Sequence, residues 1–219
     1  MKRMLFLSSK ISQLIQLCLV LPPSGVCKLT HIHELVDALD LPPSSLSRLL
    51  LCAMQRSLGD DEELQRAAIS VKHFCRVEET KLALANTPSA CEIFAECCRR
   101  SKSSNARNEL ARAMANVATV EQGARIFCNV PALEMFRSLV SSCEDNVHEV
   151  IGLACAINNI TARIALVGLP CCFAGNAGFE IWELLCHCAC RESMNDEARE
   201  WTARVYINLS LSPQGQCMT

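Results

Sequence analysis

The feature that most constrains the fold of this chain is an internal repeat with a period of 43 residues. The segment RVEETKLALANTP, which starts at Arg76, aligns without gaps with TVEQGARIFCNVP, which starts at Thr119. The same offset relates Asn116 to Asn159, and a further offset of 49 residues leads to Asn208. Repeats of this length predict units that stack side by side, because a single unit cannot bury its own apolar face.

Each unit is expected to contain three helices, and the pattern is clearest in the copy that begins at Val120. A short helix near Val120–Cys128 is followed by a second helix with Pro131 in its first turn, where the missing N–H is tolerated. A third helix is expected from about Val147 to Ile160, with small and aliphatic residues that allow close packing between units. The extra residues of the next interval are assigned to a loop, CCFAGNAG.

The composition also favours packed helices. Half of the 219 residues are hydrophobic but only 5% are aromatic, and a chain of this length can bury one sizeable core. We therefore expect a single all-α domain over residues 1–219, a helical solenoid of about four stacked units. Residues 1–59 would form an N-terminal cap and an irregular first unit. Repeats would follow at 60–103, 104–145 and 146–193, with a partial C-terminal repeat at 194–219.

The repeated helices resemble those of the armadillo family, within the ARM/HEAT superfamily. The last helix of an armadillo repeat commonly reads A-x-x-A-L-x-N-L-A, and the corresponding strings here are ELARAMANVA, LACAINNIT and TARVYINLS. PALEMFRSLV is similar to the helix that precedes it. The resemblance covers about residues 61–211 and implies a right-handed armadillo-like solenoid. A narrower likeness, in EWTARVYINLS, is to the closing repeat of the ataxin-ten family of armadillo-fold scaffolds.

The armadillo resemblance implies a protein-protein interaction scaffold or adaptor that holds a peptide or helix of a partner in a concave groove lined by the third helices. It places Asn116, Asn159 and Asn208 along that groove, where a carboxamide can both donate to and accept from an extended backbone. The alternative is that each amide caps or bridges the backbone of neighbouring helices. Both roles are open at the level of sequence.

Two arginines and a tryptophan complete the predicted partner-binding set. Arg112 and Arg204 each lie one turn before an asparagine of the set. They would favour an acidic or carboxylate-bearing partner through bidentate pairing, although exposed arginines can also serve solubility alone. Trp201 lies seven residues before Asn208. In nuclear-import adaptors a tryptophan stands four residues before the asparagine, where this chain has Arg112, Cys155 and Arg204, so an import-adaptor role is not expected.

The 16 cysteines make a disulfide, metal or redox role worth weighing. Many lie in apolar helical patterns, where a free thiol packs as a small hydrophobic group, as expected for Cys18, Cys52, Cys97, Cys128 and Cys155. Free thiols indicate a reducing compartment, and we expect a cytoplasmic protein.

A cysteine-rich segment offers the best candidate for metal binding. The CHCAC motif lacks the paired ligand spacing of structural zinc sites, so no metal site is predicted. The alternative function for the chain is a metal- or redox-responsive helical module. It would be built on Cys171, Cys172, Cys186, Cys188 and Cys190.

Several function classes are not expected. The net charge is −2 without a long basic block, which argues against nucleic-acid binding. No catalytic motif occurs, so neither an enzyme nor a cofactor is predicted. The N-terminal stretch resembles a secretory leader, but Leu7, Ile11 and Leu14 recur at helical spacing, which favours an amphipathic terminal helix. No stretch is long enough for a membrane span. The sequence makes no prediction of oligomeric state.

Overall fold

The computed structural model describes residues 41–143, 146–167, 173 and 175–211. Within these ranges the chain is helical and contains no strand, which confirms the all-α prediction. The expected N-terminal helix lies outside the described residues, as do Cys171, Cys172 and Ala174 of the expected CCFAGNAG loop. The last three residues of that expected loop, 176–178, are helical instead. The helices are α3 (Pro43–Arg56), α4 (Asp61–Phe74), α5 (Glu78–Ala85), α6 (Ala90–Arg100), α7 (Ser104–Val117), α8 (Glu121–Ile126), α9 (Val130–Ser142), α10 (Val147–Val167), α11 (Asn176–Ala189) and α12 (Asp196–Leu211).

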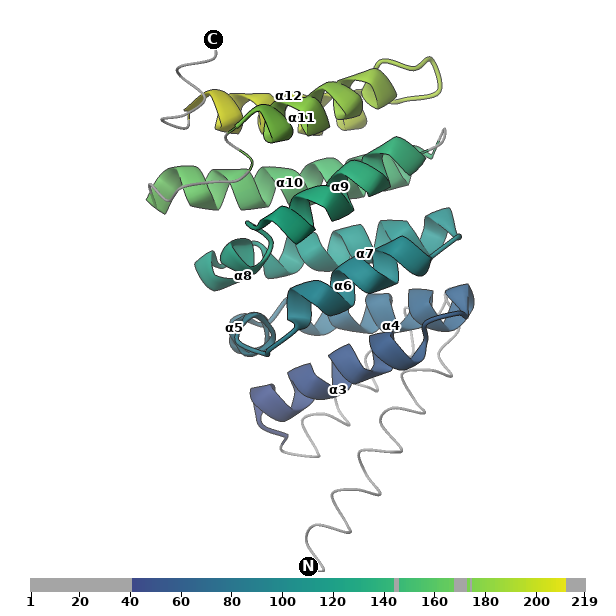
Figure 1. Cartoon of the computed structure of the whole chain (residues 1–219), viewed down its shortest axis with the longest axis vertical. Helices are drawn as coiled ribbons and strands as arrows, with labels where there is room; N and C mark the ends of the chain where they lie inside the picture. The colour runs from purple at the N-terminus through teal and green to yellow at the C-terminus, as the bar shows by residue number, and fades with distance from the viewer. Residues whose placement is uncertain (1–40, 144–145, 168–172, 174, 212–219) are drawn as a thin grey trace, which may run out of the picture.

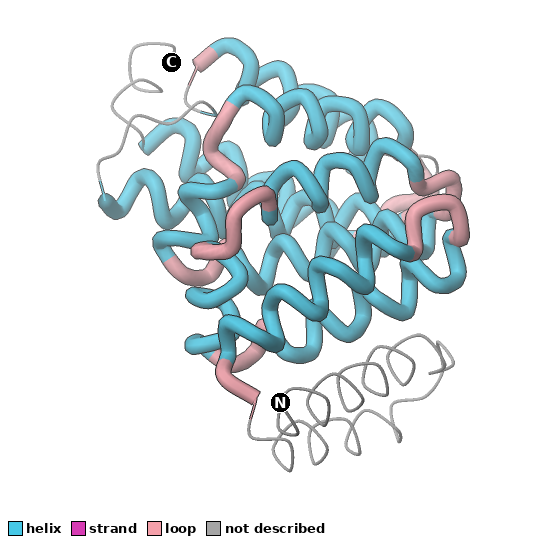
Figure 2. Tube along the Cα trace, turned by 60° about the horizontal axis from the view of Figure 1, so that its bottom comes forward, coloured by secondary structure: helices cyan, strands magenta, loops and turns pink. Residues whose placement is uncertain are grey.

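The longer helices form two rows that run through the molecule (Figures 1 and 2). In one row, which we call the α4 row, α4, α7, α10 and α12 contact one another in that order. In the other, the α3 row, α3, α6, α9 and α11 do the same. The short helices α5 and α8 contact each other at one side, seen on the left of Figure 1. No helix of the described part of the chain is both long and apolar enough to cross a membrane.

A side-chain cap begins each helix of the α4 row. In all four, the capping side chain accepts a hydrogen bond from the backbone N–H three residues further along, which satisfies one of the free donors of the first turn. The caps are Asp60, Ser103, Asn146 and Asn195. Their spacing of 43, 43 and 49 residues repeats the offsets of the asparagine series. The repeat therefore fixes where these helices begin.

Aromatic pairs tie the α3 row to the segments beside it. Phe94 of α6 packs edge-to-face on Phe127, which follows α8, with ring centroids 5.5 Å apart. Phe136 of α9 packs in the same manner on Phe173, just before α11, at 5.7 Å. All four rings are buried, and such a pair adds about 0.5–1.5 kcal/mol beyond area burial.

A buried ion pair joins the N-terminal ends of α7 and α10. Arg107 Nε donates to Glu149 Oε1 at 2.5 Å, and the Glu149 side chain is fully buried. Ser104 Oγ donates to Glu149 Oε2 at 2.8 Å, and Asn146 Nδ2 donates to Ser104 Oγ at 2.5 Å. The capping residue of α10, Asn146, is thus connected through the Ser104 hydroxyl to the ion pair between α10 and α7.

The structure differs from the sequence expectations in two further places. The third helix expected to end near Ile160 continues to Val167, because good helix formers follow and the first glycine is Gly168. Cys52, expected to be buried, is exposed. It shares one face of α3 with exposed Arg48, whereas the buried residues of α3 occupy the other face.

Candidate functional site

A pocket of about 350 Å³ opens on the α4 row, and all four helices or their ends contribute to it. We call it the row pocket. Its charged lining residues are Lys72, Arg76, Arg112 and Glu197. Its uncharged lining residues are Ala115, Asn116, Ile151, Gly152, Cys155 and Trp201. Of the six residues predicted to bind a partner, the pocket therefore contains Arg112, Asn116 and Trp201.

The three predicted asparagines connect neighbouring helices of the α4 row. The side-chain nitrogen of each asparagine donates to a backbone carbonyl of the preceding helix in the row, which is α4 for Asn116, α7 for Asn159 and α10 for Asn208. The acceptors are the carbonyl oxygens of Lys72, Ala115 and Asn158, at 2.7, 2.9 and 3.2 Å. The amide nitrogens thus have the helix-bridging role that the sequence left open. Contact with a partner stays a prediction, and Asn159 and Asn208 do not line the row pocket.

The two predicted arginines have different surroundings. Arg112 is exposed in the pocket, and no acidic side chain in the described ranges forms an ion pair with it. Arg204 pairs with Glu200 at 2.5 Å, and its guanidinium carbon lies 4.7 Å from the centre of the Trp201 ring. Arg204 therefore lies beside the pocket, with its charge already partnered, whereas the charge of Arg112 faces solvent.

Two further basic residues of the pocket were not identified from the sequence. Lys72 forms an ion pair with Glu109 of α7, and both side chains are largely buried. Arg76, just after α4, is exposed and has no ion-pair partner among the described residues. They were missed because the pocket combines residues from different repeats, which the sequence alone does not bring together.

Gly152 lines the pocket and lets α10 pack closely on α7. The offsets of 43 and 49 residues make Glu109, Gly152 and Trp201 equivalent positions of successive units, so this position lacks a side chain only in α10. A Cβ at Gly152 would lie 3.1 Å from Asn108 Oδ1 and 3.3 Å from Ala111 Cβ. A side chain here would crowd α7. The repeat alignment contained this signal, which the sequence interpretation did not use.

Cys155 is the thiol of the pocket and is partly buried. Burial raises the pKa of this thiol, and the nearby charges of Arg112 and Arg204 only partly oppose the shift, while Glu197 adds to it. The thiolate is the nucleophilic form of cysteine. A raised pKa keeps Cys155 protonated at neutral pH, which makes it a poor nucleophile.

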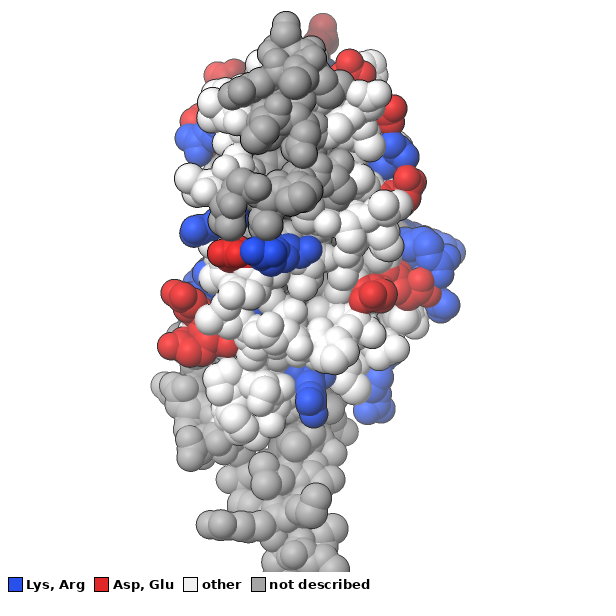
Figure 3. Space-filling model, turned by 60° about the vertical axis from the view of Figure 1, so that its left-hand side comes forward, with Lys and Arg blue, Asp and Glu red and all other residues white. Residues whose placement is uncertain are grey.

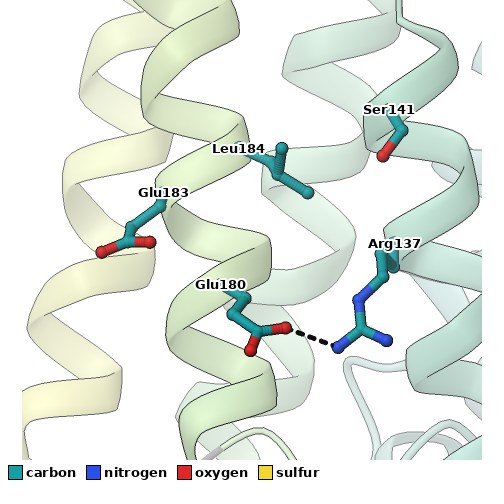
Figure 4. A pocket seen from close by; sticks show the side chains of 5 residues that line it. All are labelled: Arg137, Ser141, Glu180, Glu183 and Leu184. Atoms are coloured by element: carbon teal, nitrogen blue, oxygen red, sulfur yellow. Dashed lines mark hydrogen bonds and ion pairs between the residues drawn. The ribbon is translucent and has the colours of Figure 1, made fainter.

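A second pocket, of about 420 Å³, lies between α9 and α11 (Figure 4). It is lined by Arg137, Ser141, Glu180, Glu183 and Leu184. The guanidinium of Arg137 bonds Glu180 at 2.7 Å across the two helices and Glu134 at 2.8 Å within α9. The one basic residue that lines this pocket is therefore already neutralised.

On the face shown in Figure 3, basic and acidic side chains are interspersed with much uncharged surface.

The CHCAC segment was the sequence candidate for a metal site. Cys188 is buried, with its thiol 3.8 Å from the Val140 carbonyl oxygen; Cys186 is partly buried and Cys190 exposed. Burial raises the pKa of Cys186 to about 11. In the described part of the chain, no group of three or more His, Cys, Asp or Glu side chains is placed to hold a metal ion. Cys171 and Cys172 lie outside it.

Comparisons with known proteins add one structural similarity. No protein-family model and no curated protein matches the chain significantly. Among solved structures, the crystal structure of an engineered protein is similar, with 18% sequence identity and a TM-score of 0.42. The alignment covers 91% of this chain and 90% of the engineered one.

Proposed function

We propose that this protein is a non-enzymatic scaffold or adaptor that binds a peptide or helix of a partner protein along the α4 row. The fold proposed for it is a right-handed armadillo-like solenoid of about four units. Support comes from the 43-residue repeat together with the contacts of α4, α7, α10 and α12 in chain order. Stacking of this kind gives each unit the apolar cover that it lacks alone.

The row pocket is the observation that carries the proposal. It is built by all four helices of one row, and it contains exposed Arg76 and Arg112 together with Trp201. Tryptophan and arginine are the side chains most often found at the energetic centre of protein interfaces. Because the pocket sits on helices held by inter-helix hydrogen bonds, little ordering is required when a partner binds.

The chemistry of the pocket supports binding rather than catalysis. Among its described lining residues there is no histidine, and the one thiol, Cys155, has a raised pKa. A nucleophile with an adjacent base, which covalent catalysis requires, is not assembled there. The described cysteines are all free thiols, which supports the proposal of a cytoplasmic location.

Site-specific photo-crosslinking tests the proposal. A benzoylphenylalanine replaces Glu197, an exposed lining residue of the pocket, and in a control protein it replaces Ser138, which is exposed on α9 of the other row. We expect the Glu197 position to crosslink a discrete partner peptide that the Ser138 position does not. Equal capture from both positions, or none from Glu197, would contradict the proposal. Replacing the three asparagines is a weaker test, since their amides also hold the helices together.

A further inference from the structure

Two arginines of the row pocket, Arg76 and Arg112, form no ion pair with any other described residue. Arg112 projects from α7, and Arg76 follows the end of α4, which packs against α7. Both are exposed, and neither forms an ion pair with a side chain in the described ranges. By contrast, the third cation of the pocket, Lys72, is neutralised by Glu109. Within the described part of the chain, two guanidinium groups without an ion-pair partner therefore lie at one end of the pocket.

The opposite end of the pocket has a different character. Trp201 and Glu197 project there from α12, and Arg204 covers the tryptophan ring while it pairs with Glu200. A carboxylate would be repelled by Glu197 at this end and attracted by the arginines at the other. Between the two ends, the lining from α10 is Ile151, Gly152 and Cys155, without a formal charge at neutral pH.

We propose that the row pocket binds an acidic segment of the partner in one direction, with a carboxylate side chain on Arg76 and Arg112 and an apolar side chain against Trp201. This inference rests on the proposed function and specifies its ligand. Guanidinium groups bind carboxylates through paired, charge-assisted hydrogen bonds. The charge difference between the two ends of the pocket sets the direction of the segment.

The geometry gives the length of the segment. Helices pack with their axes about 8–10 Å apart, so two steps from α7 to α12 span about 16–20 Å. An extended peptide advances about 3.3 Å per residue. The acidic and apolar side chains of the ligand are therefore separated by about five residues. This spacing defines the probe peptides.

Fluorescence anisotropy with three labelled peptides tests the inference. The first has two adjacent glutamates followed about five residues later by two leucines; the second and third replace the glutamates by glutamines or lysines. The protein is the full chain, as wild type, as Arg76→Gln/Arg112→Gln, and as Arg48→Gln/Arg163→Gln. The last variant removes the same charge at exposed arginines outside the pocket.

We expect the glutamate peptide to bind the wild type about tenfold or more tightly than the glutamine peptide. The reason is that one charge-assisted hydrogen bond changes the affinity by about tenfold or more. Arg76→Gln/Arg112→Gln loses this preference, whereas Arg48→Gln/Arg163→Gln keeps it. Equal binding of the glutamate and glutamine peptides, an equal loss in the control variant, or no binding of the glutamate peptide overturns the inference. If crosslinking from the Glu197 position still captures a partner in that case, the carboxylate site fails while the binding surface stands.

Discussion

Replacement of Glu149 by leucine tests the role of the buried ion pair between α7 and α10. The carboxylate is fully buried and accepts hydrogen bonds from Arg107 Nε at 2.5 Å and Ser104 Oγ at 2.8 Å. Glu149→Leu leaves the Arg107 guanidinium in the interior without this partner. Loss of one member of a buried pair costs about 3–5 kcal/mol, which corresponds to a fall in Tm of roughly 6–20 °C for a chain of this size.

Urea unfolding followed by far-ultraviolet circular dichroism measures the effect. The double variant Arg107→Met/Glu149→Leu should recover most of the lost stability, since two apolar side chains can replace a buried ion pair at little cost. Glu121→Leu is the matched control. It breaks the half-exposed pair with Arg125 within α8, and such a pair contributes only about 0.3–0.5 kcal/mol. If Glu149→Leu costs no more than Glu121→Leu, or if the double variant is less stable than Glu149→Leu, the reasoning is refuted.

Three further predictions concern local features. Asn159→Ala removes the amide that donates to the preceding helix at 2.9 Å, so urea unfolding should show a loss of about 1–2 kcal/mol; an unchanged stability would rule out the bridging role. Gly123→Ala places a Cβ 1.9 Å from the Val117 carbonyl oxygen, whereas nothing lies within 4 Å of a Cβ at Gly175; calorimetry should show a lower Tm for Gly123→Ala only, and equal values would contradict this. Burial raises the pKa of Cys75 from 9.0 to about 12, so the thiol ionises first in the unfolded chain. The free energy of unfolding should therefore fall above pH 9.0 by about 1.4 kcal/mol per pH unit. Cys75→Ala should remove this part of the pH dependence, and an unaltered pH dependence would exclude the contribution of Cys75.

The repeat allowed much of the helical arrangement to be predicted. Pro131 lies in the first turn of α9, as expected, and the offsets of 43 and 49 residues recur in the caps of the α4 row. These features are local, because a cap or a first-turn proline acts within a few residues of itself. The sequence did not predict how far α10 extends, since that end depends on the absence of a stop signal before Gly168.

The candidate site was predicted only in part, for a physical reason. Arg112 and Trp201 were found because each lies at a fixed distance from an asparagine of the repeat. Arg76 and Glu197 were missed, since they become neighbours of the pocket only when four helices pack into one row. The surroundings of Arg204 could have been anticipated, because Glu200 lies four residues earlier on the same helix face.

The row pocket is lined by helices whose main contacts within the row follow the chain order. The distance between Arg76 and Trp201 is therefore the sum of three successive helix contacts, and a slight tilt repeated at each contact accumulates across the pocket. The curvature of the described stack and the affinity for a segment bound as proposed would then be coupled. By linkage, a segment that fits one curvature would oppose bending away from it, and tension along the stack would change the affinity for that segment.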